Sequence, residues 1–207
     1  TEVLPKSAIL KVWMEGGTMK EESNTTTFEA YGKNPITGQQ LIQVTLIDSK
    51  EFNNNPEMIW NYDIFVEGFW DGGGETGNIP KDKALEEIEL YIKSGYGVLT
   101  GHDTMGYVFY NQGLNKLRKY FNIEVGNWIP SASDISVIDF NTKWVYGSTK
   151  IKVEKNGLLT NFPYELPLGT ILTIPFTHTT SQAAKGNVWM TLVDGIDNYR
   201  NWGSINN

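Results

Sequence analysis

Three consecutive segments decide the fold: residues 62–70 read YDIFVEGFW, residues 80–95 read PKDKALEEIELYIKSG, and residues 97–101 read GVLTG. The outer two are dense apolar runs, as expected for strands that are covered on both faces. The middle segment has one apolar stripe at helical spacing and a proline in its first turn. It ends near Gly95, which can adopt the left-handed conformation that stops a helix. Strand, helix and strand within about 40 residues predict a βαβ unit, with neighbouring parallel strands in the sheet interior and a right-handed crossover.

The helix between these strands is predicted over residues 81–93, with Asn78 as a candidate N-terminal cap. Its apolar stripe consists of Ala84, Leu85, Ile88, Tyr91 and Ile92. We expect the helix to pack onto the sheet through Leu85, Ile88 and Ile92.

The N-terminal part predicts further β structure. Residues 9–14 form a short apolar run that ends on a glycine-containing loop. Residues 27–47 predict a β-hairpin elaboration, because two strand-like arms flank the turn sequence NPITG at residues 34–38. In the second arm Ile42, Val44 and Leu46 alternate with polar residues, which is the pattern of a strand with one buried and one solvent-exposed face.

The C-terminal part begins with a second helix and continues as β structure. The helix is expected after Gly106, because Tyr110, Leu114, Leu117 and Phe121 recur at helical spacing. Short β-like runs follow at residues 136–140, 149–154, 170–175 and 187–193. Residues 128–133 are a linker candidate but not a domain boundary. The predicted fold is α/β: one three-layer domain over residues 1–207 with a mostly parallel, flavodoxin-like sheet, and additional β structure over residues 135–207.

Composition excludes several classes of protein. The chain has 207 residues and a net charge of −7, and residues 116–119, KLRK, hold its nearest approach to a basic cluster. That segment predicts a solvated helix face, so we expect no nucleic-acid partner, whose phosphates would need many basic contacts. No apolar run approaches the ~20 residues that span a bilayer, so we expect no membrane insertion. The chain has no cysteine, which rules out a cysteine nucleophile.

The same composition gives an expectation about origin. A chain without cysteine and rich in Asn, Thr and Tyr is typical of exported proteins of Gram-positive bacteria. It begins at Thr1 without a basic-then-apolar leader, and this reads as a mature or excised segment. We therefore expect an extracellular or cell-surface location. Oligomeric state and flanking domains are left open.

Two stretches carry a resemblance to a known family: residues 62–66, YDIFV, and residues 92–104, IKSGYGVLTGHDT. They resemble the class I glutamine amidotransferase-like superfamily, in particular its ThuA-like and uncharacterised extracellular members. Residues 157–163 and 177–179 are similar to segments of the uncharacterised branch, so the resemblance covers about two thirds of the chain. In the catalytic members a strand of the 98–101 kind ends in an elbow that presents a cysteine, and here His102 fills that place. Glutamine hydrolysis in the family needs a thiolate, so amidotransferase activity is excluded.

The predicted functional site lies beyond the carboxyl ends of the parallel strands, where open α/β sheets bind ligands. We expect the loops over residues 67–74 and 101–106 to meet there, joined by a loop that carries His178. The candidate catalytic residues are His102, Asp103 and Glu67. The candidate ligand-binding residues are Trp70, Asp71, Thr104 and His178. In the alternative interpretation Asp103 caps the following helix and His102 bonds locally.

Metal binding is the open question at this site. Imidazole with carboxylate suits Zn, Mn or Fe, and the two histidines fall in separate candidate loops. No HxxxH or HExxH spacing is present, however. We therefore expect no cofactor, with a divalent metal as the alternative; if it binds, His102 and His178 should share the ion at about 2.0–2.1 Å each.

The aromatic content favours a saccharide as the ligand. Seven Trp and ten Tyr are available, and such amphipathic rings stack on sugar faces. Trp70 adjoins the site; Trp128, Trp144 and Trp202 are predicted in loops; Trp13, Trp60 and Trp189 are predicted in the core.

The leading hypothesis is a non-glutaminase amidotransferase-like domain of an exported bacterial protein that binds a small polar ligand or saccharide. The alternatives are a hydrolase or isomerase on a sugar-like substrate through His102, Asp103 and Glu67, and a structural spacer. Whether the protein is an enzyme stays open.

Overall fold

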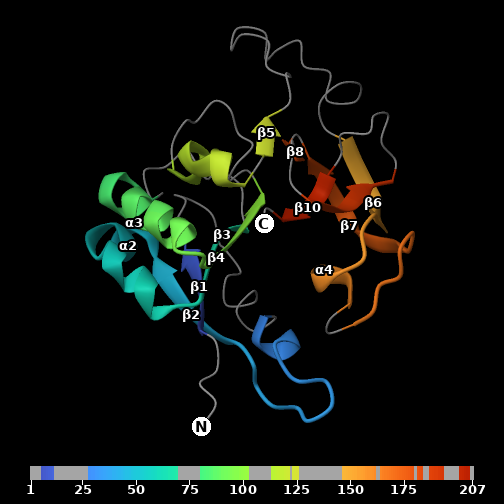
Figure 1. Ribbon diagram of the computed structural model, residues 1–207, viewed down its shortest axis with the longest axis horizontal. Helices are drawn as coiled ribbons and strands as arrows, with labels where there is room; N and C mark the ends of the chain where they lie inside the picture. Colours follow the sequence, from blue (N-terminus) through green and yellow to red (C-terminus); the bar gives the residue numbers. More distant parts are fainter. Residues whose placement is uncertain are drawn as a thin grey trace, which may run out of the picture. The chain divides into compact units, whose positions relative to one another are not determined.

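The computed structural model describes residues 6–11, 28–69, 80–102, 113–121, 123–125, 146–161, 164–179, 181–183, 187–193 and 201–205. The chain forms two compact units, Thr1–Leu117 and Arg118–Asn207, and each has a four-stranded sheet of its own (Figure 1). The first sheet is parallel and the second antiparallel, so the protein is mixed α/β. No helix in the described ranges is both long and apolar enough to cross a membrane.

The parallel sheet contains β1 (Lys6–Lys11), β2 (Gln43–Asp48), β3 (Ile64–Phe69) and β4 (Gly97–His102), in the order β2-β1-β3-β4. The predicted βαβ unit is confirmed. Strands β3 and β4 are parallel neighbours with Val66 opposite Leu99, and helix α3 (Asp82–Lys93) lies between them in sequence. One detail of the prediction is wrong: in the described part of the sheet β4 is the last strand, not an interior one, and Leu99 is 45% exposed.

Helix α3 packs through the predicted stripe. Ala84, Leu85, Ile88 and Tyr91 are buried, while Ile92 is only half-buried, so the buried face is centred one position earlier than expected. The helix ends as predicted at Gly95, whose φ of +86° suits glycine. Its N–H donates to the Ile92 carbonyl at 3.0 Å and the Tyr96 N–H to the Tyr91 carbonyl at 3.2 Å, the hydrogen-bond pair of a Schellman motif.

The start of α3 is held by a residue from another helix. The Lys81 N–H donates to the Asn53 side-chain oxygen at 2.8 Å, and Asn53 belongs to α2 (Ser49–Asn54). This bond supplies a partner for a backbone N–H just before the helix begins. The predicted cap, Asn78, lies outside the described residues.

Helices cover one face of the parallel sheet: α2 contacts β1 and β2, α3 packs beside α2, and the 3-10 helix η1 (Pro56–Asn61) packs against both helices. The helices α2 and α3 lie side by side (Figure 1). Phe52 of α2 packs on Phe65 of β3 with ring centroids 5.5 Å apart. Because neighbouring residues of a strand point to opposite faces, the positions of Phe65 and Glu67 belong to this helix-covered face.

The expected hairpin over residues 27–47 is not formed. Its turn is as predicted: the Asn34 side chain accepts hydrogen bonds from the Ile36 and Thr37 N–H groups, and Gly38 has a φ of +71°. The arms, however, share only a single antiparallel bridge between Lys33 and Gln40, and β2 pairs in parallel with β1. The alternating pattern predicted a strand correctly, but it does not specify the partner, which is distant in sequence.

The second unit has the antiparallel order β10-β9-β6-β7, from β6 (Tyr146–Val153), β7 (Ile171–Thr179), β9 (Asn187–Leu192) and β10 (Asn201–Ile205). A smaller sheet pairs β5 (Ile123–Val125) with β8 (Ser181–Ala183). Three predicted β runs, at residues 149–154, 170–175 and 187–193, are therefore confirmed. The fourth, at residues 136–140, and the linker candidate at residues 128–133 lie outside the described residues.

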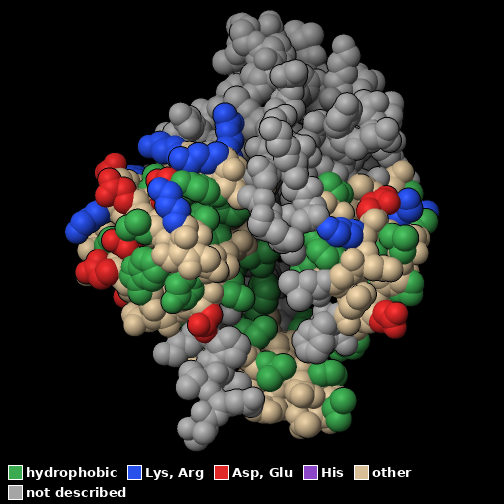
Figure 2. All heavy atoms as spheres, viewed as in Figure 1, with side chains coloured by type: hydrophobic (Ala, Val, Ile, Leu, Met, Phe, Trp, Pro, Cys, Tyr) green, Lys and Arg blue, Asp and Glu red, His purple; other side chains and the backbone are tan. Residues whose placement is uncertain are grey.

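The predicted second helix is a 3-10 helix, η2 (Gly113–Tyr120). Leu114 and Leu117 are buried as expected. Lys116, Arg118 and Lys119 are exposed, and basic side chains gather over this element in Figure 2. The interpretation of residues 116–119 as a solvated helix face is confirmed.

Candidate functional site

Glu67 is the one candidate catalytic residue whose side chain the structure describes. It lies on β3, opposite Thr100 of β4, and is only 2% exposed. Its oxygen Oε2 has no hydrogen-bond partner among the described residues. Burial raises the pKa of the Glu67 carboxyl from 4.5 to about 8, because a carboxylate loses its hydration there. At neutral pH Glu67 is therefore mostly a neutral acid that can donate a proton.

This burial follows from the strand pattern. Phe65 and Glu67 share the face that α2 and α3 cover, so a charged residue type occupies a position where the apolar alternation would place a hydrophobic one. An unpartnered buried polar atom costs about 1–3 kcal/mol, and such groups concentrate at functional sites. Glu67 is the described residue that most strongly marks a site.

His102 is the last residue of β4 and lies opposite Phe69. It is two residues beyond Thr100, the register partner of Glu67, which is roughly 7 Å along the strand. Positions 67, 69, 100 and 102 belong to one face of the sheet by strand alternation. The backbone thus brings the positions of Glu67 and His102 near each other at the carboxyl end of neighbouring strands.

The remaining candidates are not brought into this cluster by described residues. Trp70, Asp71, Asp103 and Thr104 lie outside the described part of the chain. His178 was expected in a loop, but it lies within β7 opposite Gly147, in the second unit. An ion shared by His102 and His178 stays a prediction. Within the described ranges no group of three or more His, Cys, Asp or Glu side chains could hold a metal.

The tryptophans divide differently from the prediction. Trp189 is buried as expected. Trp60, also predicted in the core, is 39% exposed, and its indole N–H donates to Glu87 Oε2 at 2.8 Å. Trp202, predicted in a loop, lies in β10. Trp13, Trp70, Trp128 and Trp144 lie outside the described residues. Hydrophobicity alone predicted burial for Trp60, whereas its position in a short surface helix decides its exposure.

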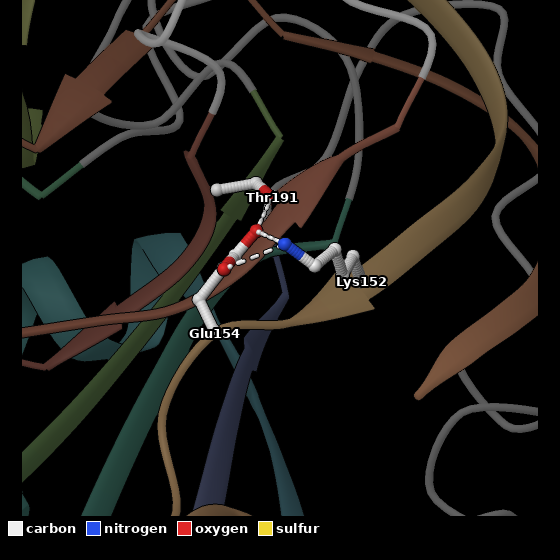
Figure 3. A network of polar contacts seen from close by, with 3 residues as sticks. All are labelled: Lys152, Glu154 and Thr191. Carbon is white, nitrogen blue, oxygen red and sulfur yellow. Dashed lines mark hydrogen bonds and ion pairs between the residues drawn. The ribbon is translucent and has the colours of Figure 1, made fainter. Parts of the chain in front are cut away.

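A polar network missed by sequence reasoning joins Lys152, Glu154 and Thr191 in the antiparallel sheet (Figure 3). The Thr191 hydroxyl donates to Glu154 Oε1 at 2.7 Å, and Lys152 Nζ lies 3.1 Å from the same oxygen. The hydrogen bond from Thr191 lowers the pKa of Glu154, aided by Lys152. Lys152 and Thr191 are cross-strand neighbours, so this network ties β6 to β9 and is structural.

The segment at residues 157–161, part of the stretch that carried the resemblance, also has a structural role. The buried Thr160 hydroxyl accepts from the Gly157 N–H at 2.9 Å and donates to the Lys155 carbonyl at 3.0 Å. A Cβ at Gly157 would lie 2.6 Å from the Trp189 ring. Glycine is needed here because the backbone approaches the indole closely.

Comparison with known proteins supports the fold and goes no further. No protein-family profile and no curated protein matches the sequence. The chain is similar in structure to the crystal structure of a ThuA-like protein from Bacteroides uniformis, with a TM-score of 0.51 and 14% sequence identity. The match covers 100% of this chain and 78% of that one. The chain therefore shares the fold of a ThuA-like protein, in agreement with the resemblance at residues 62–66 and 92–104.

Proposed function

We propose that this chain is a glutamine amidotransferase-like domain without glutaminase activity, which binds a saccharide at the carboxyl edge of its parallel sheet. The observation that carries the proposal is Glu67: it has a buried carboxyl whose Oε2 has no hydrogen-bond partner among the described residues, and it is in register with the strand that ends at His102. A protein that binds nothing there would gain stability from an apolar residue at this position. This argues against the spacer hypothesis.

The proposed fold is the three-layer, flavodoxin-like one. The order β2-β1-β3-β4 matches the first four strands of the flavodoxin-like order, in which ligands bind where the order reverses, between β1 and β3. Glu67 lies on β3, one of these two strands. The proposed ligand-binding residues Trp70 and Asp71 follow β3 in the sequence. The proposed catalytic residue Asp103 and the proposed ligand-binding residue Thr104 follow β4.

The proposed role of Glu67 is to donate a hydrogen bond or a proton. With a pKa of about 8 its carboxyl is protonated at pH 7, so it can donate to a sugar hydroxyl. The same raised pKa favours a second function, a hydrolase or isomerase in which Glu67 is the general acid, because acids poised near the working pH transfer protons best. His102 and Asp103 would then be its partners. The exported, cell-surface setting and a role for His178 or a divalent metal are further parts of the proposal.

The experiment is a glycan-panel binding assay with purified protein, wild type and three variants. His102→Ala should weaken binding of the selected saccharide at least ~10-fold by removing a contact. Glu67→Gln should keep binding within a few-fold but abolish any turnover, because an amide still donates hydrogen bonds but does not transfer protons. Glu86→Gln, an exposed position on α3, is the matched control and should change nothing. A wild-type protein that binds no saccharide, or binding that His102→Ala leaves intact, would remove the proposal.

A further inference from the structure

A cluster of three aromatic rings lies at the opposite, amino-terminal edge of the parallel sheet. Trp60 comes from η1, Tyr91 from α3 and Tyr96 from the turn before β4. Tyr91 and Tyr96 stack with centroids 4.5 Å apart, and Trp60 meets Tyr96 edge-on at 5.7 Å with an angle of 85°. We call Trp60, Tyr91 and Tyr96 the aromatic corner, because two of its rings meet nearly at a right angle.

The aromatic corner is exposed and held in place. Trp60 is 39% and Tyr96 41% exposed. The Trp60 indole N–H is anchored on Glu87, and the Tyr91 hydroxyl donates to the Tyr62 carbonyl at 2.9 Å. Rings that are already fixed lose little conformational entropy when a ligand stacks on them. A purely structural cluster would gain more by burying both rings.

The geometry excludes an aromatic cage for a cation. Centroid separations of 4.5–5.7 Å are contact distances, so no ligand fits between the rings. A ligand must lie on their outer surface, and it must be amphipathic, with an apolar face for the ring and polar groups for the rim. The sugar ring has these properties, since its C–H face stacks on aromatic rings while its hydroxyls project sideways.

The rim of the aromatic corner offers a hydrogen-bond acceptor. Glu87 holds Trp60 through Oε2, and its carboxylate lies at the ring edge. Leu90, one helical turn further along, is 50% exposed and extends the apolar surface. Burial raises the pKa of Tyr91, and the negative charge of Asp63 raises it further. Acidic side chains lie over α2 and α3 in Figure 2. Anionic ligands are disfavoured here.

We propose that the aromatic corner is a binding site for a neutral saccharide, with Trp60 and Tyr96 as stacking surfaces and Glu87 as a hydroxyl acceptor. It is separate from the proposed site at Glu67 and His102, because β3 and β4 are parallel and their first residues lie at the other edge of the sheet. Six residues of strand separate the two edges by about 17–20 Å. A long glycan could contact both edges, but neither site depends on the other.

The test is affinity electrophoresis of the full chain in native gels containing hydroxyethylcellulose, soluble starch or glucomannan. Wild type should be retarded in at least one of the gels, and Trp60→Ala and Tyr96→Ala should each reduce the retardation at least fivefold. Trp60→Phe, which keeps a stacking ring but loses the bond to Glu87, should retain part of it. The matched control is Tyr31→Ala, an aromatic residue more exposed than Trp60 in the same unit, and it should migrate like wild type. Thermal unfolding of each variant verifies that it is folded.

A His102→Ala background separates this proposal from the proposed function, because it removes the saccharide contact at the carboxyl edge. Retardation that remains in His102→Ala and is lost when Trp60→Ala is added belongs to the aromatic corner. Absence of retardation for wild type in all three gels would overturn the proposal. Retardation of His102→Ala that survives the addition of Trp60→Ala would also overturn it. So would a wild-type dimer in sedimentation analysis that Trp60→Ala converts to a monomer, because the aromatic corner would then be a contact between copies of the chain.

Discussion

At the scale of single residues, Glu67 should make the stability of the fold depend on pH. Its pKa is about 8 in the folded protein and 4.5 as an ordinary Glu. Between these values the folded state keeps a proton that the unfolded chain has lost. Its stabilising contribution is therefore complete below pH 4.5 and falls as pH rises towards 8, with a slope of up to about 1.4 kcal/mol per pH unit.

Glu67→Gln removes this titration while keeping the size of the side chain. In urea unfolding at pH 5, 6, 7 and 8, we expect the wild type to lose stability relative to the variant as pH rises. The difference between the two proteins is the readout, because all other groups titrate in both. Glu86→Gln on the exposed side of α3 should run parallel to wild type. Parallel curves for Glu67→Gln would mean that the carboxyl is ionised and solvated.

Glu67 was a candidate because it was expected at the start of the loop over residues 67–74, whereas it lies within β3. The absence of a hydrogen-bond partner for its Oε2 among the described residues could not be predicted, because it depends on which side chains the covering helices bring to it. The exposure of Trp60 could not be predicted from the sequence either. Its indole N–H bonds to Glu87, a residue 27 positions away in the sequence. Local patterns do not report such contacts.

At the scale of elements, α3 is the support of the parallel sheet, and Ile88 is its most informative position. The side chain is fully buried, so Ile88→Ala should cost about 2–5 kcal/mol in unfolding free energy. Leu90→Ala on the same helix, at a half-exposed position, is the control and should cost much less. Chemical denaturation of both variants measures this. A loss below about 1 kcal/mol for Ile88→Ala would contradict the packing of α3 on the sheet.

The end of α3 gives a second test at this scale. A Cβ at Gly95 would meet nothing within 4 Å, but the φ of +86° is unfavourable for any other residue. Gly95→Ala should therefore destabilise by about 1 kcal/mol through backbone strain alone. Gly97, two residues on, has no positive φ and would place its Cβ 3.5 Å from Ile64, an ordinary contact. Gly97→Ala should be close to neutral in the same denaturation assay, and equal losses would contradict this account of the helix end.

The elements that local chemistry specifies were predictable: the turn at residues 34–38, the stop at Gly95 and the strands β3, β4 and β9. The pairing of β2 with β1 was not, because two short strands separated by more than 30 residues carry no signal for each other. The same holds for the bond from Lys81 to Asn53. Long-range partners are chosen by packing of the whole unit.

At the scale of the whole molecule, the resemblance of residues 62–66 and 92–104 to the glutamine amidotransferase-like superfamily raises the question of glutaminase chemistry. The chain has no cysteine, and a thiolate is the nucleophile of that reaction. We expect no ammonia release from glutamine by the purified protein under reducing or oxidising conditions, in a coupled ammonia assay. Sustained turnover that copurifies with the protein and is lost in Glu67→Gln would contradict this expectation.

The sequence predicted one domain with a β-rich C-terminal portion, and the chain forms two compact units, each with its own sheet. The change from alternating strand and helix to consecutive strands was visible in the sequence from residue 135. The boundary between the two units was not visible in the sequence. It falls after Leu117, within η2, where no glycine- or proline-rich linker marks it.

Amide chemical-shift mapping by NMR can show whether a saccharide binds at the carboxyl edge of the parallel sheet. The isotope-labelled chain is titrated with the saccharide selected in the glycan panel. We expect saturable shifts centred on Thr100 to Thr104 and on Glu67 to Asp71, and His102→Ala should require at least ~10-fold more saccharide to produce them. Shifts confined to Trp60, Glu87 and Tyr96 would support the aromatic corner and contradict the carboxyl-edge site. A titration that leaves both edges unmoved would contradict both.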